Sequence, residues 1–492
     1  MGGPEWANGR LTGMASTRLI FNVTLSRSGR TAAAHPDESW TNLSSFPGGG
    51  SKQGAAGFAD ASVVRSLDTC ARRVGRLWSM TVERAKANKQ AIKRMIEYEP
   101  VLLDIQRALD VVPGMKANML LTSGAPLPWS EITGIQRRAV IQGVLYEGLA
   151  QTYEEAEAKL DAGEIPVEPT QVHGCIGAAT GVYTASMPVY VVENKTAGNR
   201  AYCNLVEGNP PRLFAYAAWG EDVHERMTFV RDVLAPVMGQ AIRNAGGIAL
   251  KPIMRRALAM GDDLHTRNDA ATQLFAAALV PHFFDIAKER EDDVRRVFHF
   301  LQTTPFMFMR IGIAAAKTAL DWAHGIEGSS VVTGMIHSAK EFSIRVSGLG
   351  DQWFGGPHLE FQGKLFWGNS YEDIGWAGGE SSVMETMGLG GFAQAAAFAL
   401  PFRGTIEETV ERNRRMYDIT VGENPEFKIP YFERGIPTGI DLFKVLETGY
   451  GPVINGAAIR KDGDGAAGVG PLVAKLDVFE TAMAAYKERY GA

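Results

Sequence analysis

The sequence lacks the short motifs that define several large classes of enzymes and binding proteins. It contains no GxxxxGK(S/T) phosphate loop, no GxSxG nucleophile elbow and no acid-rich EF-hand loop, and no two histidines stand at metal-ligand spacing. Its three cysteines, Cys70, Cys175 and Cys203, are far apart and form no CxxC pair. We therefore expect neither a zinc hydrolase nor a disulfide framework, and the cysteine usage fits a reducing cytoplasm.

Long apolar runs and an excess of basic residues are also missing. The longest apolar run, residues 388–402, contains Gln394 and is shorter than the roughly 20 residues that a bilayer requires. The segment from Leu19 to Leu25 is too short and too polar for the core of a signal peptide. The net charge is −5 and no basic tract occurs. Neither a membrane nor a nucleic acid is therefore an expected partner.

The remaining composition is typical of an ordinary globular protein. Hydrophobic residues make up 45% and charged residues 21% of the 492 residues. That length corresponds to about two to four domains. The order of strand-like and helix-like segments predicts a multi-domain α/β fold of mixed sheets with a largely helical central block. The predicted ranges are a poorly defined segment at residues 1–80, an α/β domain at 81–219, a helical block at 220–325 and a C-terminal α/β domain at 326–492.

Hydrophobic periodicity predicts the individual elements. Strands are expected at residues 118–121, 189–192, 201–206, 213–218, 330–335, 341–346 and 452–457. Helices are expected at residues 82–109 with an interruption at Pro100, 130–146, 153–162, 222–244, 251–260, 265–284, 292–301, 306–323, 382–400, 405–418 and 476–489.

A polar turn follows the buried strand expected at residues 189–192. It carries Glu193, Asn194 and Lys195, and then Asn199 and Arg200 before the next strand. Polar groups at the end of a strand lie at the edge of a sheet, where α/β proteins often bind small ligands. We therefore predict a substrate-binding wall here. The alternative is a polar β-hairpin with a surface turn.

The segment MGDDLHTRN, residues 260–268, gathers two acids, a histidine, an arginine and an amide at the start of a predicted helix. Asp262 and His265 are three residues apart, and Asp263 and Arg267 are four apart, so each pair would be neighbours on a helix. An aspartate could orient His265 as a proton carrier while Arg267 binds an anion. In the alternative, Asp262 caps the helix and Asp263 forms a surface ion pair with Arg267.

Three later segments carry further candidate ligands. Ser329 and Ser330 follow two glycines at the end of a helix, where they offer hydroxyls to an anion or form an ordinary turn. Arg345 stands on an apolar strand, so it needs an acidic partner or binds a carboxylate or phosphate, and Asp351 lies in the loop after it. The glycine loop at residues 388–391 could hold an anion, although glycine before a helix is common.

Eight segments occur in the order of a known family: ENKTAGNRAYC, MGDDLHTRN, AHGIEGSS, RVSGLGDQWF, ETMGLGGFA, YDITVGENPEF, GIPTGID and GPVIN. Together they resemble the family of domain of unknown function 1116, from about residue 92 to the carboxyl end. Its bacterial members are encoded beside an FdrA-type protein, and one branch supplies a subunit of oxamate carbamoyltransferase. That enzyme of anaerobic allantoin and purine degradation interconverts oxalurate plus phosphate with oxamate plus carbamoyl phosphate.

The chemistry of such a reaction, which handles small anions and needs one acid–base group, suggests a role for each candidate residue. Anion binding is implied for Arg200, Arg267 and Arg345, proton transfer for His265 with Asp262 and Asp263, polarisation of the carbamoyl carbonyl for Asn194, Asn199 and Asn268, and further substrate contacts for Glu193, Lys195, Ser329, Ser330 and Asp351. The chain departs from the family pattern at residues 15–80, 133–138 and 171–175. Two altered loops near the expected site favour a different substrate or a changed role within a complex.

Three hypotheses follow. The leading one is a cytoplasmic subunit of a carbamoyl-transferring enzyme, forming a homo-oligomer, a complex with FdrA-type partner subunits, or both. The second is a stand-alone hydrolase of a cyclic amide or ureide, in which His265 and an aspartate activate water. The third is a non-catalytic scaffold for a partner's active site. No cofactor is predicted, although magnesium is possible if Asp262, Asp263, Glu193 and Glu380 come together.

Overall fold

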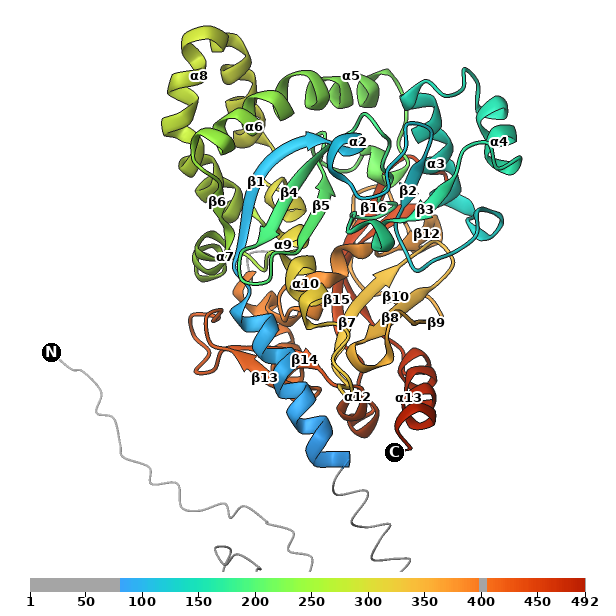
Figure 1. Cartoon of the computed structure of the whole chain (residues 1–492), viewed down its shortest axis with the longest axis vertical. Coiled ribbons are helices and arrows are strands. Elements are labelled where there is room, and N and C mark those ends of the chain that lie inside the picture. The colour runs from blue at the N-terminus through green and yellow to red at the C-terminus, as the bar shows by residue number, and fades with distance from the viewer. Residues whose placement is uncertain (1–79, 398–404, 492) are drawn as a thin grey trace, which may run out of the picture. The chain divides into compact units, whose positions relative to one another are not determined.

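The computed structural model describes residues 80–397 and 405–491. The segment predicted at residues 1–80 lies outside these ranges except for its last residue. The chain combines helices with several separate sheets (Figure 1), which confirms the predicted α/β class. The predicted domain boundaries stay a prediction.

A four-stranded antiparallel sheet organises the first half of the described chain, in the order β5-β4-β1-β6. Its strands are β1 (Pro100–Arg107), β4 (Pro188–Asn194), β5 (Arg200–Asn204) and β6 (Ile248–Ala249). Successive residues of β4 face two different cores: Tyr190 and Val192 pack in the main core, and Val189 and Val191 pack in a smaller one. Burial on both faces explains why this strand reads as an uninterrupted apolar run.

A second sheet has the order β10-β16-β15-β12, with β11 paired to β16. Its strands are β10 (Glu360–Phe361), β11 (Lys364–Leu365), β12 (Ile374–Ala377), β15 (Val453–Arg460) and β16 (Ala466–Val473). A three-stranded sheet combines β7 (Val332–His337), β8 (Phe342–Val346) and β9 (Trp353–Gly356). Two pairs complete the strands: β2 (Leu120–Thr122) with β3 (Val167–Pro169), and β13 (Thr420–Asn424) with β14 (Ile436–Ile440).

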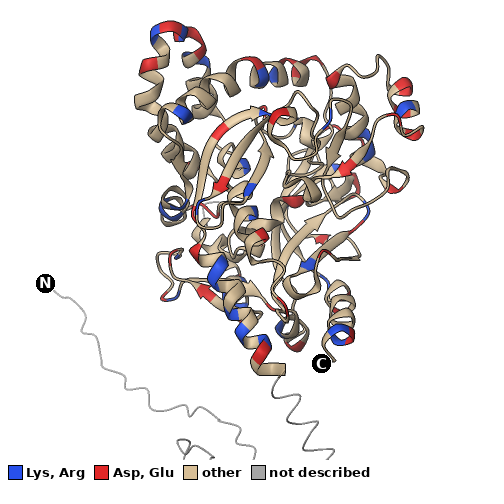
Figure 2. Ribbon diagram, viewed as in Figure 1, with Lys and Arg blue, Asp and Glu red and all other residues tan. Residues whose placement is uncertain are grey.

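Helix α9 (Phe308–Ala323) is the most deeply buried long helix of the described chain, and it packs on β4 and β5. Residues 80–97 are also helical. The other helices are α2 (Ala108–Val111), α3 (Gly134–Glu147), α4 (Tyr153–Asp161), α5 (Glu221–Phe229), α6 (Ala235–Asn244), α7 (Leu250–Ala259), α8 (Asp269–Thr303), α10 (Val383–Thr386), α11 (Ile406–Arg415), α12 (Leu442–Thr448) and α13 (Asp477–Tyr490). Figure 2 shows charged residues of both signs along the outer helices, including the turn of α8.

Within the described residues, α8 is the one helix long and apolar enough to cross a membrane, judged by length and composition alone. It is kinked at Arg290 and carries Pro281. Phe275, Leu279 and Phe283 are buried in the main core, where α8 packs against α6 and α7. These contacts are those of a core helix.

Three element predictions are wrong. The helix predicted at residues 82–109 ends at residue 97, and residues 100–107 form β1 between two neighbouring strands. The strand predicted at 213–218 is a 3-10 turn at Phe214–Tyr216. The helix predicted at 382–400 is broken into short turns within its described part, because Gly388 and Gly390 adopt positive φ angles of 88° and 57°.

Candidate functional site

A cavity of about 210 Å³ lies between the second sheet, the start of α9 and several loops. Small residues form much of its wall, which leaves room for a ligand. No lysine or arginine of the described chain belongs to its lining. The lining consists of Ala178, Ala179, Asn209, Pro210, Tyr216, His265, Thr266, Pro305, Phe306, Met309, Phe366, Gly378, Ser381, Gly456, Ala457, Ala466, Gly468 and Val469.

His265 and Glu385 form a buried acid–base pair at this cavity. The Nδ1 atom of His265 lies 2.8 Å from Oε1 and 3.0 Å from Oε2 of Glu385. Both side chains are buried, and Oε1 also accepts hydrogen bonds from the backbone N–H groups of Gly391 (2.7 Å) and Asn455 (3.1 Å). Within the described chain, Nε2 of His265 has no hydrogen-bond partner, and the residue lines the cavity. Nε2 is therefore the ring atom available to a substrate.

The charge state of His265 is set by two opposing effects. Burial disfavours the imidazolium, but the charge and hydrogen bond of Glu385, together with the charge of Asp263, favour it. The balance raises the pKa of His265 above its ordinary value. A histidine with a raised pKa is protonated to a larger extent near neutral pH and is therefore available there to supply a proton.

Asp263 anchors the loop that carries His265. Its Oδ1 accepts hydrogen bonds from the backbone N–H groups of His265 (3.0 Å), Thr266 (2.9 Å) and Arg267 (2.8 Å). Its Oδ2 accepts from the hydroxyl of Thr266 (2.6 Å) and from the side-chain amide of Asn455 (2.9 Å). Asp263 therefore positions His265, and it does not line the cavity.

Asp262 and Arg267 belong to the same loop but do not line the cavity. The Oδ2 atom of Asp262 accepts from the N–H of Ala271 (2.8 Å), near the start of α8, and burial raises the pKa of Asp262 to about 6. Arg267 approaches Asp262 (3.4 Å) and Asp269 (3.6 Å), so its ionic partners differ from the predicted Asp263. Asn268 donates to the carbonyl of His265 (3.0 Å) and also holds the loop.

Backbone strain gathers around the cavity. Three non-glycine residues of the described chain have φ in the left-handed region: Ala179 (52°), Ala217 (59°) and Leu264 (66°). Ala179 lines the cavity, Leu264 precedes His265, and Ala217 follows the lining residue Tyr216. Such conformations cost of order 1–3 kcal/mol each and are concentrated at functional sites.

The polar hairpin at residues 193–200 contributes nothing to the cavity lining. Glu193 pairs with Lys195 (2.6 Å) and Arg200 (2.8 Å), and both cationic side chains are exposed. The buried carboxamide oxygen of Asn194 accepts from the N–H of Thr196 (3.1 Å) within the turn, and Asn199 donates to a carbonyl of α9. These contacts match the alternative of a polar hairpin with a surface turn.

The other predicted ligands also have structural partners. Ser329 and Ser330 bond to Asn88 of the helix at residues 80–97, and Ser330 also bonds to Asp441. Arg345 pairs with Asp321 at 2.8 Å, as expected for an arginine on an apolar strand. The side chain of Asp351 is fully exposed. None of these residues lines the cavity.

Glu380 is a buried anchor for the loops beside the cavity. Its carboxylate accepts from the N–H groups of Gly124 (3.1 Å) and Gly177 (2.8 Å), from the hydroxyl of Thr170 (2.6 Å) and from the side-chain amide of Gln171 (2.7 Å). It thereby fixes the chain next to the lining residues Ala178, Ala179 and Ser381. In the described chain no three His, Cys, Asp or Glu side chains are close enough to hold a metal ion, so the four acids proposed for magnesium do not form such a group.

The sequence did not assign a role to Glu385 or Asn455. Glu385 is 120 positions from His265, and Asn455 is 192 positions from Asp263. The one local signal is the glycine loop at residues 388–391, shortly after Glu385, which the sequence predicts as an anion cradle. A Cβ atom at Gly390 would lie 2.0 Å from Oε1 of Glu385, so this glycine makes room for the carboxylate.

Comparison with known proteins identifies the family. The family model of oxamate carbamoyltransferase subunit AllG matches residues 165–381. The chain is 36% identical to oxamate carbamoyltransferase subunit AllG of Escherichia coli over 414 residues, which cover 83% of this chain and 98% of AllG. It is 39% identical to the uncharacterized protein YahG of Escherichia coli over 439 residues, covering 88% and 92% of the two chains.

A solved structure agrees with this relationship. A crystal structure of a conserved protein of unknown function from Enterococcus faecalis has a TM-score of 0.80 and 37% sequence identity, and the match covers 83% of this chain and 99% of that one. Identity at this level over most of both chains indicates a shared family as well as a shared fold. The chain belongs to the AllG family.

Proposed function

We propose that this chain is a subunit of a carbamoyl-transferring enzyme for small ureides and 2-oxo-acid amides, with His265 and Glu385 as its acid–base pair. The observation that carries the proposal is an imidazole fixed at Nδ1 by a buried carboxylate, with Nε2 available in a cavity of about 210 Å³. The similarity to the AllG subunit supports the reaction class.

The proposed chemistry needs one proton carrier. When phosphate attacks the carbamoyl carbon of a ureide such as oxalurate, a C–O bond forms and the C–N bond to the oxamate nitrogen breaks. The leaving nitrogen must take up a proton, and in the reverse direction the same nitrogen must lose it. Nε2 of His265 would donate that proton as imidazolium and take it back as imidazole. The raised pKa of His265 suits the donating step.

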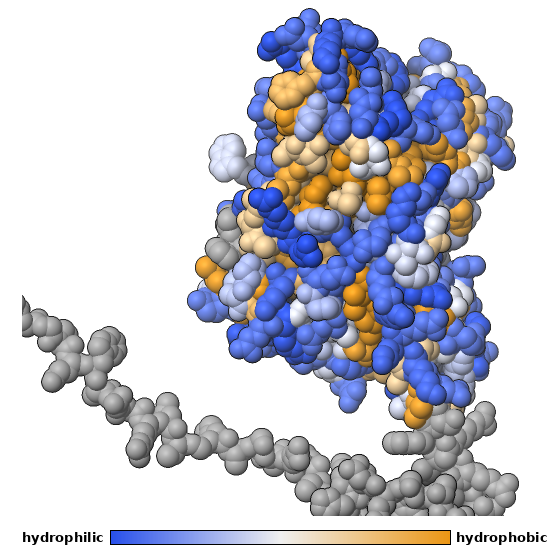
Figure 3. Space-filling model, turned by 60° about the vertical axis from the view of Figure 1, so that its left-hand side comes forward, coloured by the Kyte–Doolittle hydropathy of each residue, from blue (hydrophilic) through white to orange (hydrophobic). Residues whose placement is uncertain are grey.

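The cavity also suggests why the chain would act as a subunit. Phosphate and carbamoyl phosphate are anions that enzymes hold with arginine, lysine or metal ions. The described lining provides no lysine or arginine, and Arg200, Arg267 and Arg345 are paired elsewhere. We infer that a partner subunit, of FdrA type or a second copy, supplies the cationic part of the site. One face of the chain presents an apolar area between hydrophilic ones (Figure 3), as a subunit interface would require.

The test is a reconstituted assay. The chain is purified with the subunits encoded beside its gene, and phosphate-dependent cleavage of oxalurate is followed with wild type and with His265→Gln. We expect turnover in the wild-type complex and a loss of about 10²- to 10⁴-fold in the variant. Lys195→Ala, on the exposed hairpin, is the control and should keep full turnover. Unchanged turnover with His265→Gln would favour the scaffold hypothesis.

A second candidate is hydrolysis of a neutral cyclic amide or ureide. The lining without lysine or arginine suits an uncharged ring, and the His265–Glu385 pair could activate water. This function predicts ring opening by the single chain without phosphate. Dependence on phosphate and on a partner subunit would contradict it.

A further inference from the structure

Arg310 of α9 is a buried cation without a counter-ion in contact. Its side chain is 1% exposed, and its Nη1 donates to the side-chain oxygen of Asn204 at 2.7 Å. Its Nε has no hydrogen-bond partner, and no carboxylate oxygen of the described residues lies within 4.0 Å of its nitrogens. A buried charge is costly unless it is paired. This arginine therefore needs an explanation.

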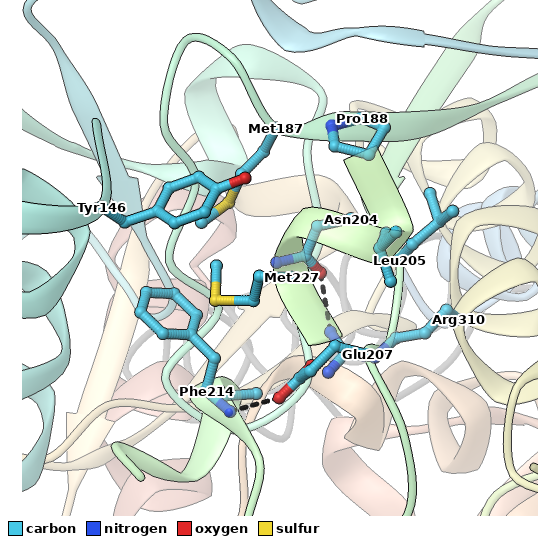
Figure 4. A pocket seen from close by; sticks show the side chains of 11 residues that line it. Tyr146, Met187, Pro188, Asn204, Leu205, Glu207, Phe214, Met227 and Arg310 are labelled. Atoms are coloured by element: carbon cyan, nitrogen blue, oxygen red, sulfur yellow. Dashed lines mark hydrogen bonds between the residues drawn. The ribbon is translucent and has the colours of Figure 1, made fainter. Parts of the chain in front are cut away.

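The guanidinium borders a second cavity of about 30 Å³, which has space for about two water molecules. Figure 4 shows Arg310, Asn204 and Glu207 converging on it, with Tyr146 and Met227 on the opposite side. The remaining lining is mostly apolar: Met187, Pro188, Leu205, Phe214, Ala215 and Val230.

This second cavity adjoins the His265 cavity. Met309 and Tyr216 line the His265 cavity, and their sequence neighbours Arg310 and Ala215 line the second cavity. The segment at residues 205–216 thus contributes to both.

No acidic group of the described residues forms an ion pair in contact with Arg310. Burial raises the pKa of Cys203 to about 12, and burial likewise raises that of Tyr216 to about 12, so both remain uncharged. Glu207 is the carboxylic acid of the described lining, and its carboxyl oxygen accepts the N–H of Phe214. Burial also raises the pKa of Glu207, against the opposing charges of Arg310 and Arg226.

We propose that Arg310, held in place by Asn204, forms a binding site for a small monovalent anion, a halide or a planar oxyanion of the size of formate. The guanidinium supplies the charge, and its Nε supplies a donor that has no partner within the described residues. The limited space excludes phosphate and larger anions. This site is separate from the proposed transfer chemistry at His265.

Thermal unfolding of the purified chain tests the proposal. Unfolding is measured in sodium chloride, bromide or formate and, at equal ionic strength, in sodium gluconate, whose anion is too large. We expect the small anions to raise Tm by about 3 °C at saturation, because a ligand of the folded state stabilises it. His265→Gln should show the same response, which separates this site from the transfer function. Equal Tm values in all salts would overturn the proposal.

Two variants and one crystal locate the anion. Arg310→Met keeps the side-chain bulk but should lose the anion response, whereas Glu207→Gln should keep it, because the amide oxygen can accept from Phe214 and the side chain carries no negative charge. Crystals grown with bromide should show an anomalous peak within about 3.5 Å of the Arg310 guanidinium. If Arg310 and Glu207 are instead bridged by water, Glu207→Gln will lower Tm in every salt and no bromide peak will be found. That result refutes the site even if Arg310→Met fails to fold.

Discussion

The substitution Glu385→Gln should change the protonation pattern of His265 while keeping the side-chain volume. Oε1 of Glu385 faces two backbone N–H groups, from Gly391 and Asn455. The amide oxygen of glutamine must take that position, because an NH₂ group there would oppose two donors. The amide nitrogen then occupies the place of Oε2, 3.0 Å from Nδ1 of His265. The amide oxygen, 2.8 Å from Nδ1, already accepts two backbone hydrogen bonds, and the NH₂ group opposes a proton on Nδ1. We therefore expect the ring proton to move to Nε2.

This exchange of tautomers sets the expected loss of activity. With Nε2 protonated in the neutral ring, His265 cannot take a proton from a substrate. The lost carboxylate charge also leaves the burial effect on the pKa of His265 opposed by Asp263 alone. Triads that lose their orienting carboxylate in this way lose about 10³- to 10⁴-fold in kcat. That loss corresponds to about 4–5.5 kcal/mol of transition-state stabilisation. The broken charge-assisted hydrogen bond should cost about 1.5–3 kcal/mol of folding stability.

Two measurements check the prediction. Nitrogen-15 NMR of histidine-labelled chain reports which ring nitrogen of His265 carries the proton, and steady-state turnover of the reconstituted complex reports kcat. Glu380→Gln is the matched control: it alters another buried glutamate with four hydrogen-bond donors, but one that does not contact His265. It should lower stability and leave the His265 tautomer unchanged.

The reasoning fails if Glu385→Gln leaves the proton on Nδ1 of His265, or if kcat falls less than about tenfold. The first result would mean that another group orients the ring. The second would mean that His265 does not transfer a proton in the slow step.

Three further predictions concern neighbouring positions. Gly390→Ala places a methyl group 2.0 Å from Glu385 at a φ of 57°, so denaturant unfolding should show a loss of at least about 3 kcal/mol or no folded protein. Burial raises the pKa of Asp262 to about 6, so the folded state loses stability relative to the unfolded state as the pH rises from about 4 to 6. Asp262→Asn should remove up to about 3 kcal/mol of this pH dependence from the free energy of unfolding, measured by unfolding titrations at several pH values. Arg200→Ala breaks only an exposed pair with Glu193 and should cost less than about 1 kcal/mol with kcat unchanged, whereas a large rise in KM would restore the hairpin as a substrate wall.

Local patterns were sufficient where an element is fixed by its own residues. The strand at 189–192 was predicted because both of its faces are buried, and most long helices were predicted from their apolar periodicity. Strand β1 was missed because its apolar residues extend the helical pattern that precedes Pro100. Its strand conformation is determined by β4 and β6, which pair with it from positions far along the chain.

The candidate site was likewise predictable where its signal is local and not where it depends on residues distant in the sequence. His265 was singled out because a histidine, two acids and an arginine in nine residues form a strong local signal, but the acid that contacts its ring is Glu385. The hairpin at 193–200 gave an equally strong signal, yet its charges are balanced by one another. Charge density in a sequence therefore marks both self-contained surface pairs and functional groups. Only the position of the cavity separates them.

The hydrogen bonds from Asn455 to Asp263 and Glu385 carry a consequence for how the chain acquires activity. They join positions up to 192 residues apart, so they close very large loops, which form after local helices and hairpins. Until β15 is in place, Asp263 in the loop of His265 lacks its hydrogen bond from the Asn455 side chain, and Glu385 lacks its hydrogen bond from the Asn455 backbone. A nascent or truncated chain ending before Asn455 would therefore carry the histidine without its fixed geometry. His265 therefore reaches its fixed geometry only after the C-terminal part of the chain has folded.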